Sequence, residues 1–121
     1  MDIESVRNYC LSLPMTTEDS AFGDDIVLFR VFDKIFCCLS LEGDGYLAVK
    51  CEPLRAIELR ERYAEIEGAY HWNKKYWNQI NLFGNLDDDF IRSQIRHSYS
   101  EVVKKLTKRI RTENPAITEI Y

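Results

Sequence analysis

The chain has 121 residues, of which 45% are hydrophobic and 30% charged, and its 16 basic and 20 acidic side chains give a formal net charge of −4. This length suits one domain with an ordinary hydrophobic core, and the apolar content is too high for a disordered protein. No stretch approaches the roughly 18 uncharged apolar residues of a membrane span, and the N-terminus does not resemble a signal peptide, so we expect a single cytoplasmic domain over residues 1–121.

The first predicted element is a helix at the N-terminus. Asp2 can cap it, its apolar residues recur at helical spacing as far as Leu13, and Pro14 ends it. Residues 15–25 mix small, polar and acidic side chains, which is typical of a loop. We expect this loop to lead the chain into a sheet.

An antiparallel meander is predicted next. Residues 26–32 and 35–41 are rich in β-branched and aromatic side chains, and only Asp33-Lys34 separates them. Two residues between strands indicate a tight hairpin. A second turn with the sequence EGDG then leads to a third strand over residues 46–51.

The second half begins with a helix and a strand. Pro53 suits the first turn of a helix, where its missing N–H costs little, and Gly68 is expected just beyond the end of that helix. A strand is predicted around residues 77–82. Extra strand pieces are expected near residues 69–72.

The longest predicted helix lies near the C-terminus. Acidic residues at 87–89 and basic residues at 104–109 suit the two ends of a helix dipole, and apolar residues keep a 3.6-residue period from Ile91 to Ile110. Residues 112–121 are expected to form a loosely ordered tail. The order αβββαβα predicts an α+β fold in which helices pack against an antiparallel sheet.

Four cysteines occur without a C-x-x-C pair. In a chain with no export signal they are expected to be reduced and mostly buried. Neighbouring cysteines on a strand face opposite sides, so the adjacent pair cannot chelate one ion. The four are Cys10, Cys37, Cys38 and Cys51.

The strongest local signal is the segment 70–78, which places two lysines, a histidine, two asparagines and four aromatic residues within nine positions. Such a mixture can hold phosphates through Lys and Asn while aromatic faces support a sugar or a base. The same aromatic residues can instead pack an edge of the core, with the lysines solvating a turn. The sequence leaves both interpretations open.

A second signal is a basic stripe on the long helix. Residues 90–111 contain seven basic side chains against one acid, Glu101. Helix-dipole complementarity or a solvated face explains part of it. The whole chain is polarised in the same sense, because residues 1–67 hold 7 basic and 14 acidic residues whereas residues 68–121 hold 9 and 6. An anionic partner would therefore meet the second half.

No catalytic grouping is visible. His71 and His97 are the only histidines, and no metalloprotease, nucleophile-elbow or nucleotide-loop motif is present. A dyad of Cys51 and His71 is imaginable, but Cys51 ends a predicted core strand, which favours an inert buried thiol. We therefore expect no catalytic residues, cofactor or metal.

Several motifs together resemble the MmcQ/YjbR-like family of small bacterial proteins. The resemblance covers nearly the whole chain and implies a CyaY-like two-layer α+β fold with a double-wing DNA-binding motif. The segments that carry it are residues 9–14, 17–23, 34–36, 47–51, 70–77 and 98–106.

The first hypothesis is a small DNA-binding protein in which cationic side chains contact phosphates, His and Asn hydrogen-bond, and aromatic rings stack or brace the patch. The alternative is a protein-interaction or small-anion-binding module, with a compact pocket at the same segment and no continuous basic stripe. We expect a monomer or weak dimer without membrane attachment. The candidate binding residues are His71, Trp72, Asn73, Lys74, Lys75, Tyr76, Trp77, Asn78, Lys104, Lys105, Lys108 and Arg109.

Overall fold

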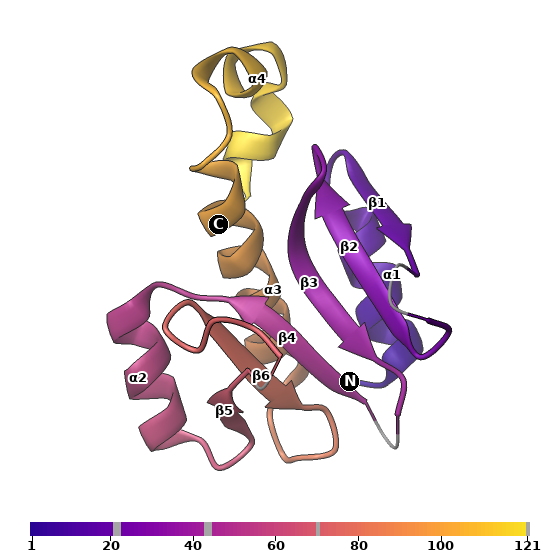
Figure 1. The fold of residues 1–121 in the computed structure, drawn as a ribbon, viewed down its shortest axis with the longest axis vertical. Helices are drawn as coiled ribbons and strands as arrows, with labels where there is room; N and C mark the ends of the chain where they lie inside the picture. The colour runs from indigo at the N-terminus through magenta and orange to yellow at the C-terminus, as the bar shows by residue number, and fades with distance from the viewer. Residues whose placement is uncertain (21–22, 43–44, 70, 121) are drawn as a thin grey trace.

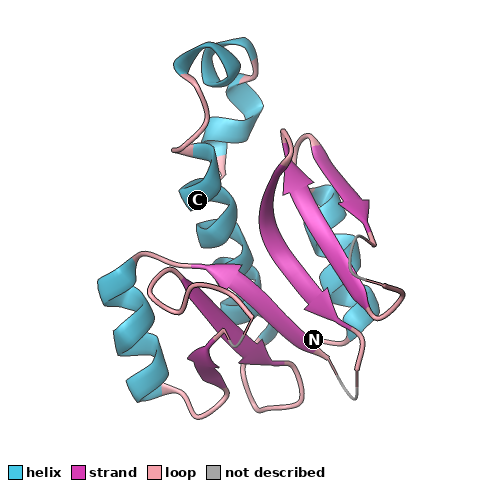
Figure 2. Ribbon diagram, in the orientation of Figure 1, coloured by secondary structure: helices cyan, strands magenta, loops and turns pink. Residues whose placement is uncertain are grey.

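The computed structural model of the chain describes residues 1–20, 23–42, 45–69 and 71–120. Over these residues it is a six-stranded antiparallel sheet with helices packed against it, which confirms the α+β class (Figures 1 and 2). In chain order the elements are α1 (Ile3–Ser12), β1 (Thr16–Asp19), β2 (Ile26–Val31), β3 (Lys34–Ser40), β4 (Tyr46–Lys50), α2 (Pro53–Arg62), β5 (Ile66–Gly68), β6 (Trp77–Asn81), α3 (Asp88–Val103), α4 (Lys108–Glu113) and the 3₁₀ helix η1 (Pro115–Glu119).

The strands lie in the order β1-β2-β3-β4-β6-β5, and every neighbouring pair is antiparallel. The β2–β3 hairpin turns at Phe32 and Asp33, whose φ angles of 46° and 65° are both positive, as in the turns that match hairpin twist. Arg30 supports this turn, because its guanidinium donates a hydrogen bond to the Asp33 carbonyl at 3.0 Å. The turn lies one residue earlier than the sequence predicts.

One face of the sheet carries the main core, which α1 and α3 cover (Figure 1). Tyr99 of α3 is fully buried there, and its ring meets Phe36 edge to face with centroids 5.2 Å apart. The Tyr99 hydroxyl donates to the Pro14 carbonyl at 2.6 Å, and burial raises the pKa of Tyr99 to about 12. A buried hydroxyl needs such a partner, so this bond fixes the chain after α1 against α3.

Two strands of the sheet are absent from the sequence-based prediction. β1 lies within the segment expected as a loop, and β5 precedes the strand pieces expected near residues 69–72. Gly68 accordingly ends a strand and does not follow a helix. Both strands pair on one side only, β1 with β2 and β5 with β6. Edge strands are short and polar, which hides the alternation that sequence reasoning relies on.

The predicted long C-terminal helix is divided into two. α3 ends at Val103, and Thr107 starts α4 by accepting a hydrogen bond from the Ile110 amide at 3.2 Å. Within residues 112–121, which the sequence predicts as a loosely ordered tail, η1 forms and Ile117 is only 1% exposed. An apolar anchor in the core explains why this segment packs more closely than its proline and polar residues suggest.

All four cysteines are free and buried, as the sequence predicts. Burial raises the pKa of Cys38 and of Cys51 to about 11, and it raises the pKa of Cys37 as well. Such thiols stay protonated and unreactive at neutral pH. No helix within the described ranges is both long and apolar enough to cross a membrane.

Candidate nucleic-acid interface

The sheet opens where β3 and β4 separate. Their pairing ends at Cys37 and Val49. Beyond that pair, Ser98 of α3 bridges the strands, because its hydroxyl accepts from the Lys50 amide at 2.7 Å and donates to the Phe36 carbonyl at 2.5 Å. A helix side chain therefore takes the place of the next sheet hydrogen bond, and the strand ends diverge (Figure 1).

A cleft of about 320 Å³ lies at this opening, and we call it the basic cleft. Its cationic side chains come from β2, β3, β4 and the residues that follow α3. One carboxylate, Asp33, accompanies them. The full lining consists of Arg30, Asp33, Lys34, Ile35, Lys50, Trp77, Val102 and Lys105.

The charges of the basic cleft are only partly compensated. Arg30 forms an ion pair with Asp19 at 2.8 Å. By contrast, Lys34, Lys50 and Lys105 make no ion pair with any residue that the structure describes. Ammonium groups gathered in this way attract phosphates through local potential, whatever the net charge of the chain.

Arg60 of α2 holds the end of the predicted binding segment. Its Nε donates to Asn78 Oδ1 at 2.6 Å, and its terminal nitrogen donates to the carbonyls of Lys74 and Trp77. Asn78 is 1% exposed, and its amide nitrogen donates to the Ala56 carbonyl at 3.4 Å. The structure thus uses Asn78 as an anchor between α2 and β6.

The aromatic residues of the segment mostly pack. Trp72 and Trp77 stack with ring centroids 4.5 Å apart, and Trp77 is 9% exposed. The Tyr76 ring is 38% exposed, with Lys75 Nζ 5.5 Å from its centroid. Asn73 shapes the turn, because its Oδ1 accepts from the Lys75 amide at 3.0 Å. Tyr70, counted within the sequence signal, lies outside the described residues.

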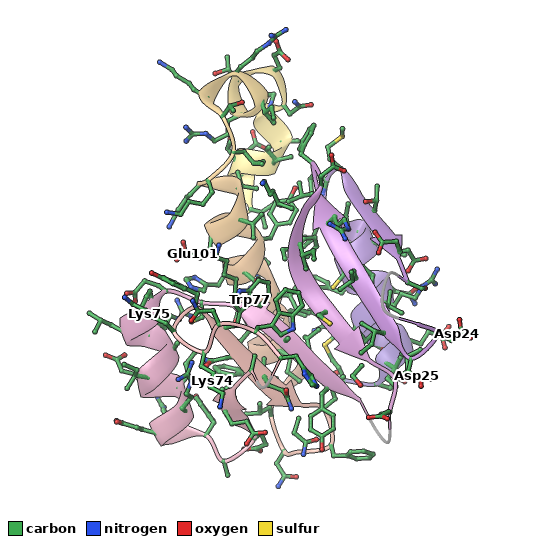
Figure 3. All side chains as sticks on the ribbon, in the orientation of Figure 1. Asp24, Asp25, Lys74, Lys75, Trp77 and Glu101 are labelled. Atoms are coloured by element: carbon green, nitrogen blue, oxygen red, sulfur yellow. The ribbon has the colours of Figure 1, made fainter. Side chains whose placement is uncertain are left out.

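The lysines of the segment and the basic C-terminal residues lie in different places. Lys74 and Lys75 lie beside α2, whereas Lys108 and Arg109 belong to α4 at the far end of the molecule (Figure 3). The two predicted signals therefore do not form one continuous patch. They approach each other at the basic cleft, which Trp77 and Lys105 both line.

Two of the C-terminal candidates carry a carboxylate partner. Lys104 Nζ lies 3.5 Å from Glu101, and Arg109 pairs with Glu113 at 3.1 Å. Lys108 makes no ion pair within the described part of the chain. The Arg109–Glu113 pair is exposed on both sides, and such pairs contribute little stability, so Arg109 can leave Glu113 for a phosphate.

His71 and Trp72 line a separate cavity of about 390 Å³ on the less covered face of the sheet. Glu42 and Glu67 also line it. These carboxylates repel a phosphate or carboxylate ligand, so this cavity does not suit the small anion that the sequence leaves open for the segment.

Cys51 and His71 are the pair that the sequence makes imaginable as a catalytic dyad. Cys51 is 2% exposed with a raised pKa, which argues against a nucleophile paired with His71. Across the described ranges, no group of three or more His, Cys, Asp or Glu side chains could hold a metal ion.

Sequence reasoning missed Arg30, Lys34 and Lys50 as site residues. Each is an isolated cation within or at the end of an apolar strand. Strand periodicity alone does not place them together, because their convergence depends on the opening that Ser98 maintains. Lys105 is the one predicted cation that the basic cleft includes.

Comparison with known proteins gives consistent matches in sequence and in structure. A family model described as YjbR matches residues 11–101. The Uncharacterized protein YbdF of Escherichia coli O157:H7 is 29% identical over 107 residues, which is 88% of each chain.

Two crystal structures show the same fold. Deinococcus radiodurans protein DR2400, with a DUF419 domain, superposes with a TM-score of 0.86 at 30% identity, over 93% of this chain and 86% of that one. A Pseudomonas syringae protein superposes with a TM-score of 0.75 at 26% identity, over 84% of this chain and 99% of that one. The similarity therefore covers most of the chain in sequence and in fold.

Proposed function

Since the chain belongs to the YjbR family, whose model matches residues 11–101, we propose that it is a cytoplasmic DNA-binding protein that holds the phosphate backbone at the basic cleft. The observation that carries the proposal is the convergence of Arg30, Lys34, Lys50 and Lys105 from four segments on one opening of the sheet. The protein acts by binding, as a monomer or weak dimer, and not by catalysis.

The shape around the basic cleft suits a nucleic-acid duplex. The β2–β3 hairpin projects beside the end of α3 (Figure 1), and it carries Arg30 and Lys34 next to its turn. β1 pairs with β2 as far as Val31, so the sheet is three strands wide at this turn, and we expect Arg30 and Lys34 to contact phosphates along the edge of a groove. This hairpin is the part of the chain that best fits a wing.

The C-terminal residues extend the surface. Lys108 and Arg109 lie in α4, which follows Lys105 after a short turn. Contacts from lysine and arginine to phosphates fix position and supply affinity, but they carry no sequence information. The proposal is therefore for binding that depends strongly on salt and weakly on base sequence.

The test compares two double variants of equal charge. K34E/K105E reverses both exposed lysines of the basic cleft, whereas K74E/K75E reverses the lysines beside α2. Both change the net charge by the same amount, so a difference between them reports position. Binding to a fluorescein-labelled duplex is measured by anisotropy at low salt, and circular dichroism checks that each variant folds.

We expect K34E/K105E to weaken binding by roughly tenfold or more, because two phosphate contacts are lost and two repulsions are gained. K74E/K75E should weaken it by a smaller factor. Equal losses in the two variants would show that net charge alone attracts DNA. Absence of binding by the folded wild type at low salt would overturn the proposal.

A further inference from the structure

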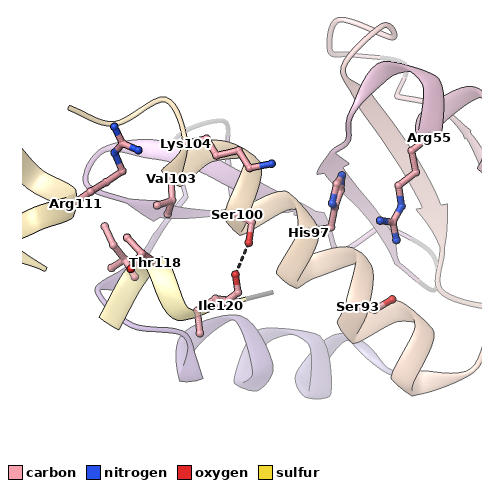
Figure 4. A pocket seen from close by; sticks show the side chains of 10 residues that line it. Arg55, Ser93, His97, Ser100, Val103, Lys104, Arg111, Thr118 and Ile120 are labelled. Atoms are coloured by element: carbon pink, nitrogen blue, oxygen red, sulfur yellow. Dashed lines mark hydrogen bonds between the residues drawn. The ribbon is translucent and has the colours of Figure 1, made fainter. Parts of the chain in front are cut away.

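A groove of about 510 Å³ runs along α3 and shares no lining residue with the basic cleft, and we call it the α3 groove (Figure 4). Arg55 of α2 and His97 lie toward one end, and Arg111 of α4 and Thr118 of η1 lie toward the other. Its size falls within the range of pockets for small organic molecules.

The α3 groove combines positive charge with an apolar wall. Arg55, Lys104 and Arg111 line it, and no carboxylate is among the described residues of its lining. Val103 and Ile117 supply the apolar wall. This combination recognises an anionic group attached to an apolar body.

One of these three charges has a carboxylate partner. Glu101 contacts Lys104 at 3.5 Å. Glu52 accepts hydrogen bonds from the Leu54 and Arg55 amides at the start of α2, both at 3.0 Å, and its pKa is lowered by those bonds. The negative charge of Glu52 thus stabilises the N-terminus of α2. Arg55 and Arg111 make no ion pair within the described chain.

Arg111 has an unused donor. Its Nε is buried and has no hydrogen-bond partner among the described residues. A buried donor without a partner is costly, and native structures rarely keep one without a reason such as a ligand. A bound anion would satisfy this nitrogen.

His97 stands at the other end of the groove in its neutral form. Its Nε2 accepts a hydrogen bond from the Glu52 amide at 3.2 Å, so that nitrogen carries no proton and the 3.5 Å contact to Glu101 is not an ion pair. Burial, Arg55 and Lys104 lower the pKa of His97, against the opposing effects of Glu101 and Glu52.

We infer that the α3 groove is a binding site for a small organic anion that carries a phosphate or carboxylate group on an apolar body. Arg111 holds the anionic group at its own end of the groove, and Arg55 at the opposite end adds to the positive potential. Val103 and Ile117 contact the apolar part. This site is separate from the DNA surface, and it stands whether or not DNA is bound.

The test is an NMR titration of the folded protein with phenyl phosphate, with phenol as the uncharged probe of the same ring. We expect saturable shifts of the His97 ring and of the Thr118 and Ile120 amides with phenyl phosphate and not with phenol. The pKa of His97 should rise when phenyl phosphate is bound, because the added negative charge favours the imidazolium form. Sodium benzoate in place of phenyl phosphate distinguishes a carboxylate site from a phosphate site.

Arg111→Met and Arg109→Met are matched variants, since both remove one positive charge from α4. Arg111→Met should weaken phenyl phosphate binding roughly tenfold, the usual scale for losing a charged hydrogen bond. Arg109→Met should leave phenyl phosphate binding unchanged, and Arg111→Met should leave DNA binding unchanged. The two variants thus separate a failure of the anion site from a failure of the DNA proposal.

Three results would each overturn the inference. One is the absence of shifts at His97 and Thr118 at millimolar phenyl phosphate and benzoate. Another is phenol binding as tightly as phenyl phosphate, which would make the groove merely apolar. The third is an equal loss of phenyl phosphate affinity in Arg111→Met and Arg109→Met.

Discussion

Asn78 offers a direct test of how the structure uses the segment 71–78. Asn78→Ala removes the side chain that joins α2 to β6 through a 2.6 Å bond from Arg60 and a 3.4 Å bond to the Ala56 carbonyl. A hydrogen bond to a charged group contributes about 1.5–3 kcal/mol, and the longer bond adds little. We therefore expect the free energy of unfolding to fall by about 2–3 kcal/mol, which lowers Tm by roughly 10 °C in a domain of this size.

The measurement is urea and thermal unfolding followed by circular dichroism. Asn73→Ala is the control, because Asn73 makes its 3.0 Å bond to the Lys75 amide in an exposed turn and should cost less than about 1 kcal/mol. The indole signals of Trp72 and Trp77 should also move in Asn78→Ala, since Asn78 follows Trp77 on β6 and Trp72 stacks on Trp77. A stability within about 0.5 kcal/mol of wild type, or equal to that of Asn73→Ala, would refute the assigned anchoring role.

Three further predictions concern the core and the buried titratable groups. Because the pKa of His97 is lowered in the folded state, the unfolded chain takes up a proton first as the pH falls below 6.5. The urea midpoint of the wild type should then fall with pH until the folded-state pKa of His97 is reached. A midpoint that does not change with pH, or the same fall in His97→Gln, would contradict this. Ile117→Ala should cost about 2–4 kcal/mol in thermal unfolding, whereas Ile57→Ala, at a site 49% exposed, should cost far less; equal costs would show that η1 does not pack. The four buried thiols should react slowly with an aromatic disulfide reagent in the native protein and rapidly in urea, and one thiol reacting at once in the native state would argue against its burial.

The sequence predicts those elements that bury one face in the core, because their apolar residues recur at a regular spacing. α1, the β2–β3 hairpin and β4 are each buried on one face and lie within a residue or two of their predicted bounds. α2 begins at Pro53 as predicted but ends at Arg62, well before Gly68. The sequence does not predict β1 and β5, because each is an edge strand of three or four residues that pairs on one side only. Such a strand is too short and too polar to show an alternation of apolar and polar residues. The prediction of one uninterrupted C-terminal helix was wrong, because Leu106 and Ile110 keep the helical spacing of apolar residues across the turn before α4.

The candidate site was harder to predict than the fold. The aromatic and amide side chains of residues 70–78 are typical of a binding motif, yet Trp77 and Asn78 are buried and pack within the protein. The cations that do converge, such as Lys34 and Lys50, are single residues on separate strands. Their proximity is set by the divergence of β3 and β4 around Ser98, a tertiary feature without a local sequence signal.

The salt dependence of duplex binding tests the central claim most directly. Lys34, Lys50, Lys105 and Lys108 are the basic-cleft and α4 lysines that make no ion pair within the described residues. At about 0.9 per phosphate contact, four contacts give a slope of log K against log salt of about −3.6, or roughly a 150-fold loss between about 50 and 200 mM salt. K34Q/K105Q should halve the slope to about −1.8. A slope near zero, or one that this variant leaves unchanged, would contradict phosphate binding at the basic cleft.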